Sequence, residues 1–255
     1  RGLGDVYKRQ TYIQEMLGDS RYSEEDILAA INHLKVEGGK KFSLNTLDAT
    51  RQFYNGEPRG NWSPIEMFAA KDVLLLGTGP GVAEHRVALE AYIKMHKPVV
   101  VALNTQSGVA QELIDVRVAC HPIRLLADCE AHTQLPQPLI TPASMLPADV
   151  LLALNGKTLL DYGLSVKTNT FEFGEKACAL PTSLVICYAL AVITAGGASK
   201  IMMAGFDGYG ADDPRNSEMN KLLQFYAANS ASLELLSVTP TRYEIKSQSI
   251  YGLAG

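Results

Sequence analysis

The sequence has few cysteines, one tryptophan and no excess of positive charge. Its four cysteines form no Cys-x-x-Cys pair, which argues against a disulfide framework and a zinc site. A net charge of −4 gives no basic surface for nucleic acid. The longest apolar stretch, Leu184 to Ala195, is too short for a membrane span. We therefore expect a cytoplasmic protein with buried, reduced thiols and neither nucleic acid nor membrane as a partner.

The first 64 residues show little that could form a core of their own. Residues 1–10, Arg1 to Gln10, have no periodicity and resemble a translated sequencing-adapter scar, so we exclude them and expect the natural protein to extend further upstream. Ser23-Glu-Glu-Asp26 predicts a helix start, and Gly38-Gly39 its end. Residues 55–64 are rich in turn formers and predict a linker. Residues 11–64 are thus a short helical segment plus linker.

This front segment resembles the C-terminal tail of the HMG-CoA-lyase-like aldolases, the 4-hydroxy-2-oxovalerate aldolase group. The similarity rests on Thr11–Leu17, Tyr22–Leu28 and Lys41-Phe42. It implies an upstream aldolase domain, a TIM barrel that holds a divalent metal through a His-x-His pair and an aspartate. The chain contains no His-x-His pair, so any lyase activity would belong to a longer parent of which this is a fragment. An unrelated helical hairpin is the alternative.

Residues 65–255 alternate apolar runs with helical patterns, which predicts an α/β fold. We expect a doubly wound, mostly parallel Rossmann-like sheet, because near-continuous apolar strands suit a sheet covered on both faces. The strands expected are Asp72–Leu76, Pro98–Leu103, Val116–Ala119, Val150–Leu154, Lys200–Ala204 and Leu233–Val238, with a further terminal strand within Tyr243–Tyr251. The helices expected are Val82–His96, Thr182–Ala195 and one capped by Asp213-Pro214.

A glycine-rich loop, Gly77-Thr-Gly-Pro-Gly81, joins the first strand to the first helix. Such a loop brings backbone N–H groups against a phosphate at a helix N-terminus. The dinucleotide pattern G-x-G-x-x-G is not completed, because Val82 stands at its last position. The second strand ends in Asn104-Thr105 rather than in an acid that would hold a ribose. Both departures disfavour an NAD(P)-dependent oxidoreductase. The alternative interpretation of the loop is a tight turn that binds no ligand.

Two blocks of the main domain resemble family-42 bacterial sialyltransferases and 6-hydroxymethylpterin pyrophosphokinase-like proteins. The first block is Gly77–Gly81 with Ala102–Asn104, and the second is Pro181–Cys187 with Ala198–Tyr209. The resemblance implies a nucleotide-binding, transferase-like domain for CMP or a nucleotide-linked sugar, in acidic-sugar or surface-polysaccharide biosynthesis. The nucleotide contacts it implies are Gly77, Thr78, Gly79, Pro80, Gly81, Asn104, Thr182 and Ser183. It also makes Asp207 the candidate catalytic residue.

The sequence departs from those families in ways that leave catalysis open. The sialyltransferases carry a histidine base after the aspartate block, whereas this chain has no histidine after His132. Gly81 also stands where the family has serine. A non-catalytic nucleotide-binding or scaffolding domain, which could form an oligomer, is therefore the alternative function.

Metal binding is predicted only weakly, because no metal-binding motif is present. Asp207, Asp212 and Asp213 could supply carboxylate ligands for Mg²⁺, as acids do in the pterin kinases. The alternative is a solvated acidic cap before a helix.

Overall fold

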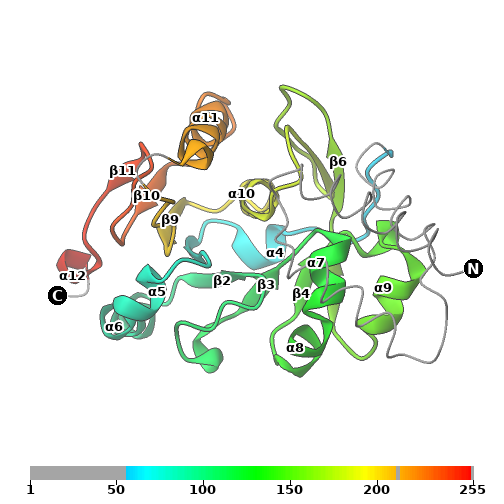
Figure 1. The fold of residues 1–255 in the computed structure, drawn as a ribbon, viewed down its shortest axis with the longest axis horizontal. Helices are drawn as coiled ribbons and strands as arrows, with labels where there is room; N and C mark the ends of the chain where they lie inside the picture. The colour runs from blue at the N-terminus through cyan, green and yellow to red at the C-terminus, as the bar shows by residue number, and fades with distance from the viewer. Residues whose placement is uncertain (1–55, 211–212, 254–255) are drawn as a thin grey trace, which may run out of the picture.

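The computed structural model describes residues 56–210 and 213–253. They form a large sheet with helices on both faces (Figure 1). This confirms the predicted doubly wound, Rossmann-like α/β fold. The predictions for residues 1–55, including the aldolase-like tail, lie outside the described residues.

The sheet has eight strands in the order β11-β10-β9-β1-β2-β3-β4-β5, and every neighbouring pair is parallel. The strands are β1 (Asp72–Leu76), β2 (Val99–Leu103), β3 (Val116–Val118), β4 (Leu139–Thr141), β5 (Leu159–Asp161), β9 (Lys200–Ala204), β10 (Leu235–Ser237) and β11 (Lys246–Ser247). The chain winds outward from β1 to β5, returns to place β9 beside β1, and winds outward again to β11. The strand order therefore reverses between β1 and β9.

The helices and a small second sheet complete the fold. The longer helices are α6 (Arg86–His96), α10 (Val185–Ala195) and α11 (Pro214–Ala227). The shorter ones are α4 (Ile65–Phe68), α5 (Gly81–Glu84), α7 (Pro122–Ala127), α8 (Cys129–Gln134), α9 (Ala148–Ala153) and α12 (Ile250–Leu253), with 3₁₀ turns η1 (Gln111–Leu113) and η2 (Ala143–Met145). The second sheet has the order β6-β8-β7 and comprises β6 (Gly163–Val166), β7 (Glu172–Phe173) and β8 (Ala177–Leu180).

Two hydrophobic clusters, one on each face, hold the helices to the sheet. Successive side chains of a strand point to opposite faces. Accordingly Val73 and Leu75 of β1 join the cluster that contains α10, whereas Leu74 and Leu76 join the cluster that contains α6. All four side chains are fully buried, which explains why the strand is apolar throughout instead of alternating. In Figure 1, α10 and α11 lie on one side of the sheet and α6 and α12 on the other.

Several predicted elements are wrong or displaced. Residues 150–154 are not a strand, because they belong largely to helix α9, Ala148–Ala153. A short apolar run has no period that separates helix from strand, and the strands β4 and β5 around it, each of three residues, are too short to be recognised. The predicted helix from Val82 to His96 is broken at His85 into α5 and α6. The terminal strand within Tyr243–Tyr251 shrinks to the two residues of β11 before α12.

The cap and cysteine predictions agree with the structure. Asp213 is the N-cap of α11, and its side chain accepts a hydrogen bond from the backbone N–H of Arg215. The four cysteines are buried and none forms a disulfide. Within the described ranges, no helix combines the length and the hydrophobicity needed to cross a membrane.

His132 of α8 is the least satisfied polar side chain in the described core. It is fully buried, and neither ring nitrogen has a hydrogen-bond partner among the described residues. Burial, helped by the nearby positive charges of Lys157, Arg117 and Arg124, lowers the pKa of His132 from 6.5 to about 4. The folded protein therefore holds this imidazole neutral.

We predict that His132 makes the fold sensitive to mild acid. Because its pKa is lower in the folded than in the unfolded state, its contribution is complete above pH 6.5 and is lost as the pH falls toward 4. The loss approaches about 3 kcal/mol. Urea denaturation at several pH values measures it as the difference between the natural protein and His132→Leu. In the matched control His96→Leu, which alters an exposed histidine, the pH dependence should stay that of the natural protein. Equal pH dependence in all three proteins would contradict the prediction.

Candidate functional site

The point at which the strand order reverses brings the two predicted sequence blocks together. Leu76 of β1 pairs with Ala204 of β9, so Gly77 and Gly205 leave the sheet side by side. The backbone N–H of Gly77 donates to Ala204 O at 2.8 Å, and that of Gly79 donates to Gly205 O at 2.9 Å. Open α/β sheets bind ligands in the crevice outside the carboxyl ends of the strands at such a point. The glycine loop and Asp207 thus share one edge of the sheet.

The carboxylate of Asp207 lies inside the glycine loop. The backbone N–H of Gly81 donates to Asp207 Oδ2 at 3.2 Å. A Cβ on Gly79 would collide with Oδ2, and a Cβ on Gly81 would collide with Oδ1. A Cβ on Gly77 would lie only 2.5 Å from the carbonyl oxygen of Gly205. The closeness of the two loops therefore requires Gly77 and Gly79, which both face the Gly205 carbonyl oxygen, whether or not a phosphate binds. Gly81 is needed only while the Asp207 carboxylate lies against it.

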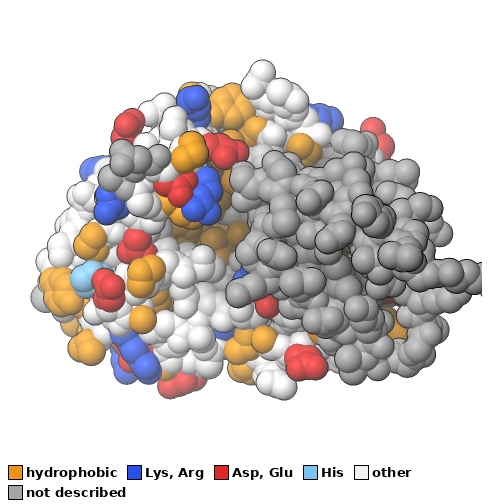
Figure 2. Space-filling view, viewed as in Figure 1, with side chains coloured by type: hydrophobic (Ala, Val, Ile, Leu, Met, Phe, Trp, Pro, Cys, Tyr) orange, Lys and Arg blue, Asp and Glu red, His pale blue; other side chains and the backbone are white. Residues whose placement is uncertain are grey.

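A cavity of about 230 Å³ opens beside this contact, and we call it the switch-point cavity. Its lining comes from the loops after β1 and β9, the end of β2, the start of α10, α11 and Tyr243. The lining residues are Thr78, Gly79, Leu103, Leu184, Val185, Ile186, Gly205, Phe206, Asp207, Gly208, Tyr209, Met219 and Tyr243. Most of them are apolar or aromatic, and Asp207 is the acid among them. Figure 2 shows a hollow with hydrophobic side chains in its depth and charged side chains of both signs on its rim.

Helix α10 directs its N-terminus at the switch-point cavity. Leu184 is its N-cap, without a side-chain cap, and Leu184, Val185 and Ile186 line the cavity. The first N–H groups of a helix lack intrahelical partners and attract anions. The predicted contacts Thr182 and Ser183 precede the helix instead of starting it, and neither lines the cavity. Their assignment as nucleotide contacts stays a prediction.

Asn104 is held next to this site in a conformation that suits its residue type. Its φ of 50° lies in the left-handed region, which asparagine tolerates better than most residues. Its N–H donates to Val118 O at 2.9 Å, and the neighbouring Leu103 lines the cavity. No described residue forms a hydrogen bond with the Asn104 side chain.

Arg117 is a positioning residue that the sequence reasoning missed. Its side chain is fully buried in β3 and makes its hydrogen bonds to neutral acceptors. Nη1 donates to the carbonyl oxygens of Asn104 at 3.0 Å and Gln106 at 2.8 Å, and Nε donates to Gln137 Oε1 at 2.8 Å. Burial lowers the pKa of Arg117 to about 10.

The bonds of Arg117 extend to the glycine loop through one more residue. Gln106 donates from Nε2 to the carbonyl oxygen of Gly77 and accepts at Oε1 from the backbone of Ser107 and Gly108. The buried cation therefore fixes the loop after β2, and Gln106 connects that loop to the loop after β1. A single arginine within a short apolar strand is the signal that could have found it.

The rim of the switch-point cavity combines aromatic rings with cations. The guanidinium carbon of Arg215 lies 3.9 Å from the centroid of the Tyr209 ring. Tyr243 lines the same cavity, and burial raises its pKa to about 12. Arg242 packs its aliphatic stem against Gly208, and no described carboxylate forms an ion pair with it. The Arg242 cation thus stands beside Gly208, which lines a largely apolar cavity with one acid among its described residues.

The described acids do not converge on a metal position. Asp213 is bound to Arg215 at 2.6 Å, and its hydrogen bonds with that residue lower its pKa to about 2. Asp212 lies outside the described residues, and among those that are described no three potential ligands cluster. Asp213 therefore does not fit a Mg²⁺ site, and Mg²⁺ binding stays an untested prediction.

Comparison with known proteins shows a similarity of fold to a solved structure. No protein-family model matches the sequence, and no curated protein matches it significantly. The fold is similar to that of a glycosyltransferase. This solved structure is the MAf glycosyltransferase from Magnetospirillum magneticum AMB-1, with a TM-score of 0.52 and 10% identity. The match covers 80% of this chain but 38% of that one, so this chain spans well under half of its length. At this identity, the similarity shows the fold alone.

We predict that Gly81 and Asp207 are energetically coupled. Gly81→Ala should destabilise the fold by about 1–3 kcal/mol, because the new Cβ meets only Asp207 side-chain atoms. In an Asp207→Ala background the same change should be neutral or stabilising by up to about 1 kcal/mol, since alanine favours the helix that begins there. Urea denaturation of the four proteins measures the coupling.

Gly252→Ala in α12 provides the matched control, because its Cβ would meet no atom within 4 Å. Equal costs of Gly81→Ala with and without Asp207 would show that the carboxylate does not lie in the loop.

Proposed function

We propose that this chain contains a transferase-like domain that binds CMP or a nucleotide-linked sugar in the switch-point cavity. The observation that carries the proposal is the meeting of the glycine loop, the N-terminus of α10 and Asp207 at the reversal of strand order. The similarity to a glycosyltransferase fold supports the same class. An upstream aldolase domain and a place in acidic-sugar or surface-polysaccharide biosynthesis are the finer parts of this proposal.

The chemistry of the cavity suits a nucleoside with its phosphate at the mouth. Tyr209 and Phe206 offer ring faces on which a base can stack. The N–H groups at the start of α10 and the guanidinium of Arg242 offer positive charge to a phosphate. The volume of about 230 Å³ is below the ~300–1,000 Å³ of ordinary ligand pockets. The sugar of a nucleotide-linked sugar would therefore extend out of the cavity.

In a transfer reaction Asp207 is the base that the cavity offers. An acceptor hydroxyl would attack the anomeric carbon of the donor as the bond to the phosphate breaks. The hydroxyl proton would pass to the carboxylate, and the nucleotide would leave with the bonding electrons. The bond from Gly81 N–H engages Oδ2 and leaves Oδ1 to accept the proton.

Nucleotide binding without transfer is the second candidate function. It is favoured by the absence of histidine among the described residues that line the switch-point cavity, and by the structural use of Asp207 in holding the glycine loop. An NAD(P)-dependent oxidoreductase is disfavoured further, because the fully buried Val82 packs where the dinucleotide pattern has its last glycine.

Calorimetric titration with CMP, CDP and GTP, with and without Mg²⁺, tests for the pocket. We predict that CMP binds, and that Arg242→Ala weakens CMP about tenfold but leaves cytidine unchanged, since only CMP carries a phosphate. Tyr209→Ala should weaken both ligands about tenfold through lost stacking.

Arg86→Ala is the matched control, because Arg86 pairs with Glu90 on α6 and lines neither cavity. Failure of all three nucleotides to bind would refute the proposal. An equal loss of CMP and cytidine in Arg242→Ala would refute the phosphate assignment.

A further inference from the structure

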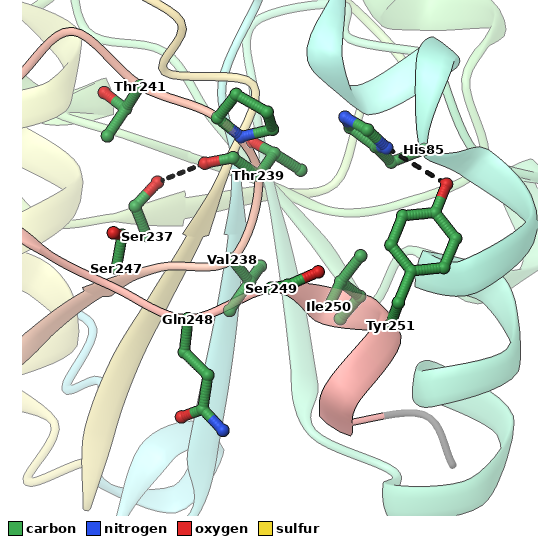
Figure 3. A pocket seen from close by; sticks show the side chains of 11 residues that line it. His85, Ser237, Val238, Thr239, Thr241, Ser247, Gln248, Ser249, Ile250 and Tyr251 are labelled. Carbon is green, nitrogen blue, oxygen red and sulfur yellow. Dashed lines mark hydrogen bonds between the residues drawn. The ribbon is translucent and has the colours of Figure 1, made fainter.

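A second and larger cavity lies on the other side of the loop that carries Asp207. Its volume is about 350 Å³, and it is formed by His85, residues 237–241 after β10 and residues 247–251 after β11 (Figure 3). Six of its residues carry hydroxyl groups: Ser237, Thr239, Thr241, Ser247, Ser249 and Tyr251. We call it the hydroxyl cavity.

The two cavities share a wall. Thr239 Oγ1 accepts a hydrogen bond from the N–H of Gly205 at 3.0 Å, and Thr241 Oγ1 donates to Phe206 O at 2.6 Å. Gly205 and Phe206 line the switch-point cavity, whereas the two threonines line the hydroxyl cavity. Two ligands, one in each cavity, would therefore be separated only by these residues.

The hydroxyl groups divide into structural ones and available ones. Ser237 donates to Thr239 O at 2.8 Å, so its hydroxyl and those of the two threonines hold the wall together. By contrast, the side chains of Ser247, Gln248 and Ser249 form no hydrogen bond with any described residue. They lie on the segment that leads from β11 into α12. These groups can both donate and accept, as a sugar hydroxyl does.

His85 and Tyr251 close the opposite side of the hydroxyl cavity. The Tyr251 hydroxyl lies 3.2 Å from His85 Nδ1, and the rings meet edge to face. In Figure 3 the other ring nitrogen of His85 faces the gap toward Thr239, and no described residue bonds it. The Tyr251 side chain is 61% exposed, which leaves much of an aromatic ring open to a ligand.

Among the described residues that line the hydroxyl cavity there is no lysine, arginine, aspartate or glutamate. No lysine, arginine or carboxylate of the described lining therefore pairs with the ligand, whereas paired donors and acceptors beside an exposed ring suit a molecule with hydroxyl groups and an apolar C–H face. We propose that the hydroxyl cavity binds a neutral saccharide unit. This saccharide binding does not depend on the proposed function. The further suggestion that the saccharide is the acceptor of a transfer reaction does rest on it.

Saturation-transfer NMR tests the site with the whole 255-residue chain. The probes are the methyl glycosides of glucose, galactose and mannose at millimolar concentration, with N-acetylserine amide as a hydroxyl compound that is not a sugar. At least one glycoside should bind, and Tyr251→Ala and Ser249→Ala should each weaken it about tenfold. Both side chains are exposed, so both variants should fold, which circular dichroism checks.

Tyr209→Ala is the matched control, because it removes a tyrosine from the switch-point cavity and should leave glycoside binding unchanged. Absence of any glycoside signal, a signal unaffected by both variants, or binding of N-acetylserine amide alone would overturn the site. Glycoside binding without CMP binding would leave the site standing and refute the proposed function. CMP binding without glycoside binding would do the reverse.

Discussion

The placement of the Asp207 carboxylate inside the loop Gly77–Gly81 is the constraint on which the rest of the site depends. Three alternating glycines after a strand suggest a phosphate cradle, yet here each glycine already faces a close approach from the loop after β9. The carboxylate accepts the N–H of Gly81, which a phosphate would otherwise take. A phosphate is therefore better placed toward the N-terminus of α10 and Arg242 than within the loop. This contact also joins the loop after β1 to the loop after β9.

The fold was largely predictable, because its central strands are long and apolar. The bounds of β1 and β9 were predicted to the residue. The two strands lie side by side where the strand order reverses. The helix α9 and the strands β4 and β5 were missed, because elements of three to six residues show no clear period.

The site was only half predictable, since its residue types were visible but their partners were not. Nothing local in the sequence shows that Asp207 faces Gly81, that Arg117 reaches the loop after β2, or that Arg242 stands beside Gly208. Such contacts join residues far apart in the chain. The same holds for the hydroxyl cavity, whose His85 lies in the break between α5 and α6 that the periodicity concealed. The fold thus places two cavities of different chemistry on the two sides of one wall.

Backbone amide chemical shifts test whether the reversal point between β1 and β9 binds a nucleotide, as we propose. On addition of CMP to the labelled chain, the account predicts that the largest shifts fall on Gly77–Gly81, Val185–Cys187 and Gly205–Tyr209. Residues 247–251 of the hydroxyl cavity should respond little. Shifts that concentrate away from these three segments, or no shifts at all, would contradict the account.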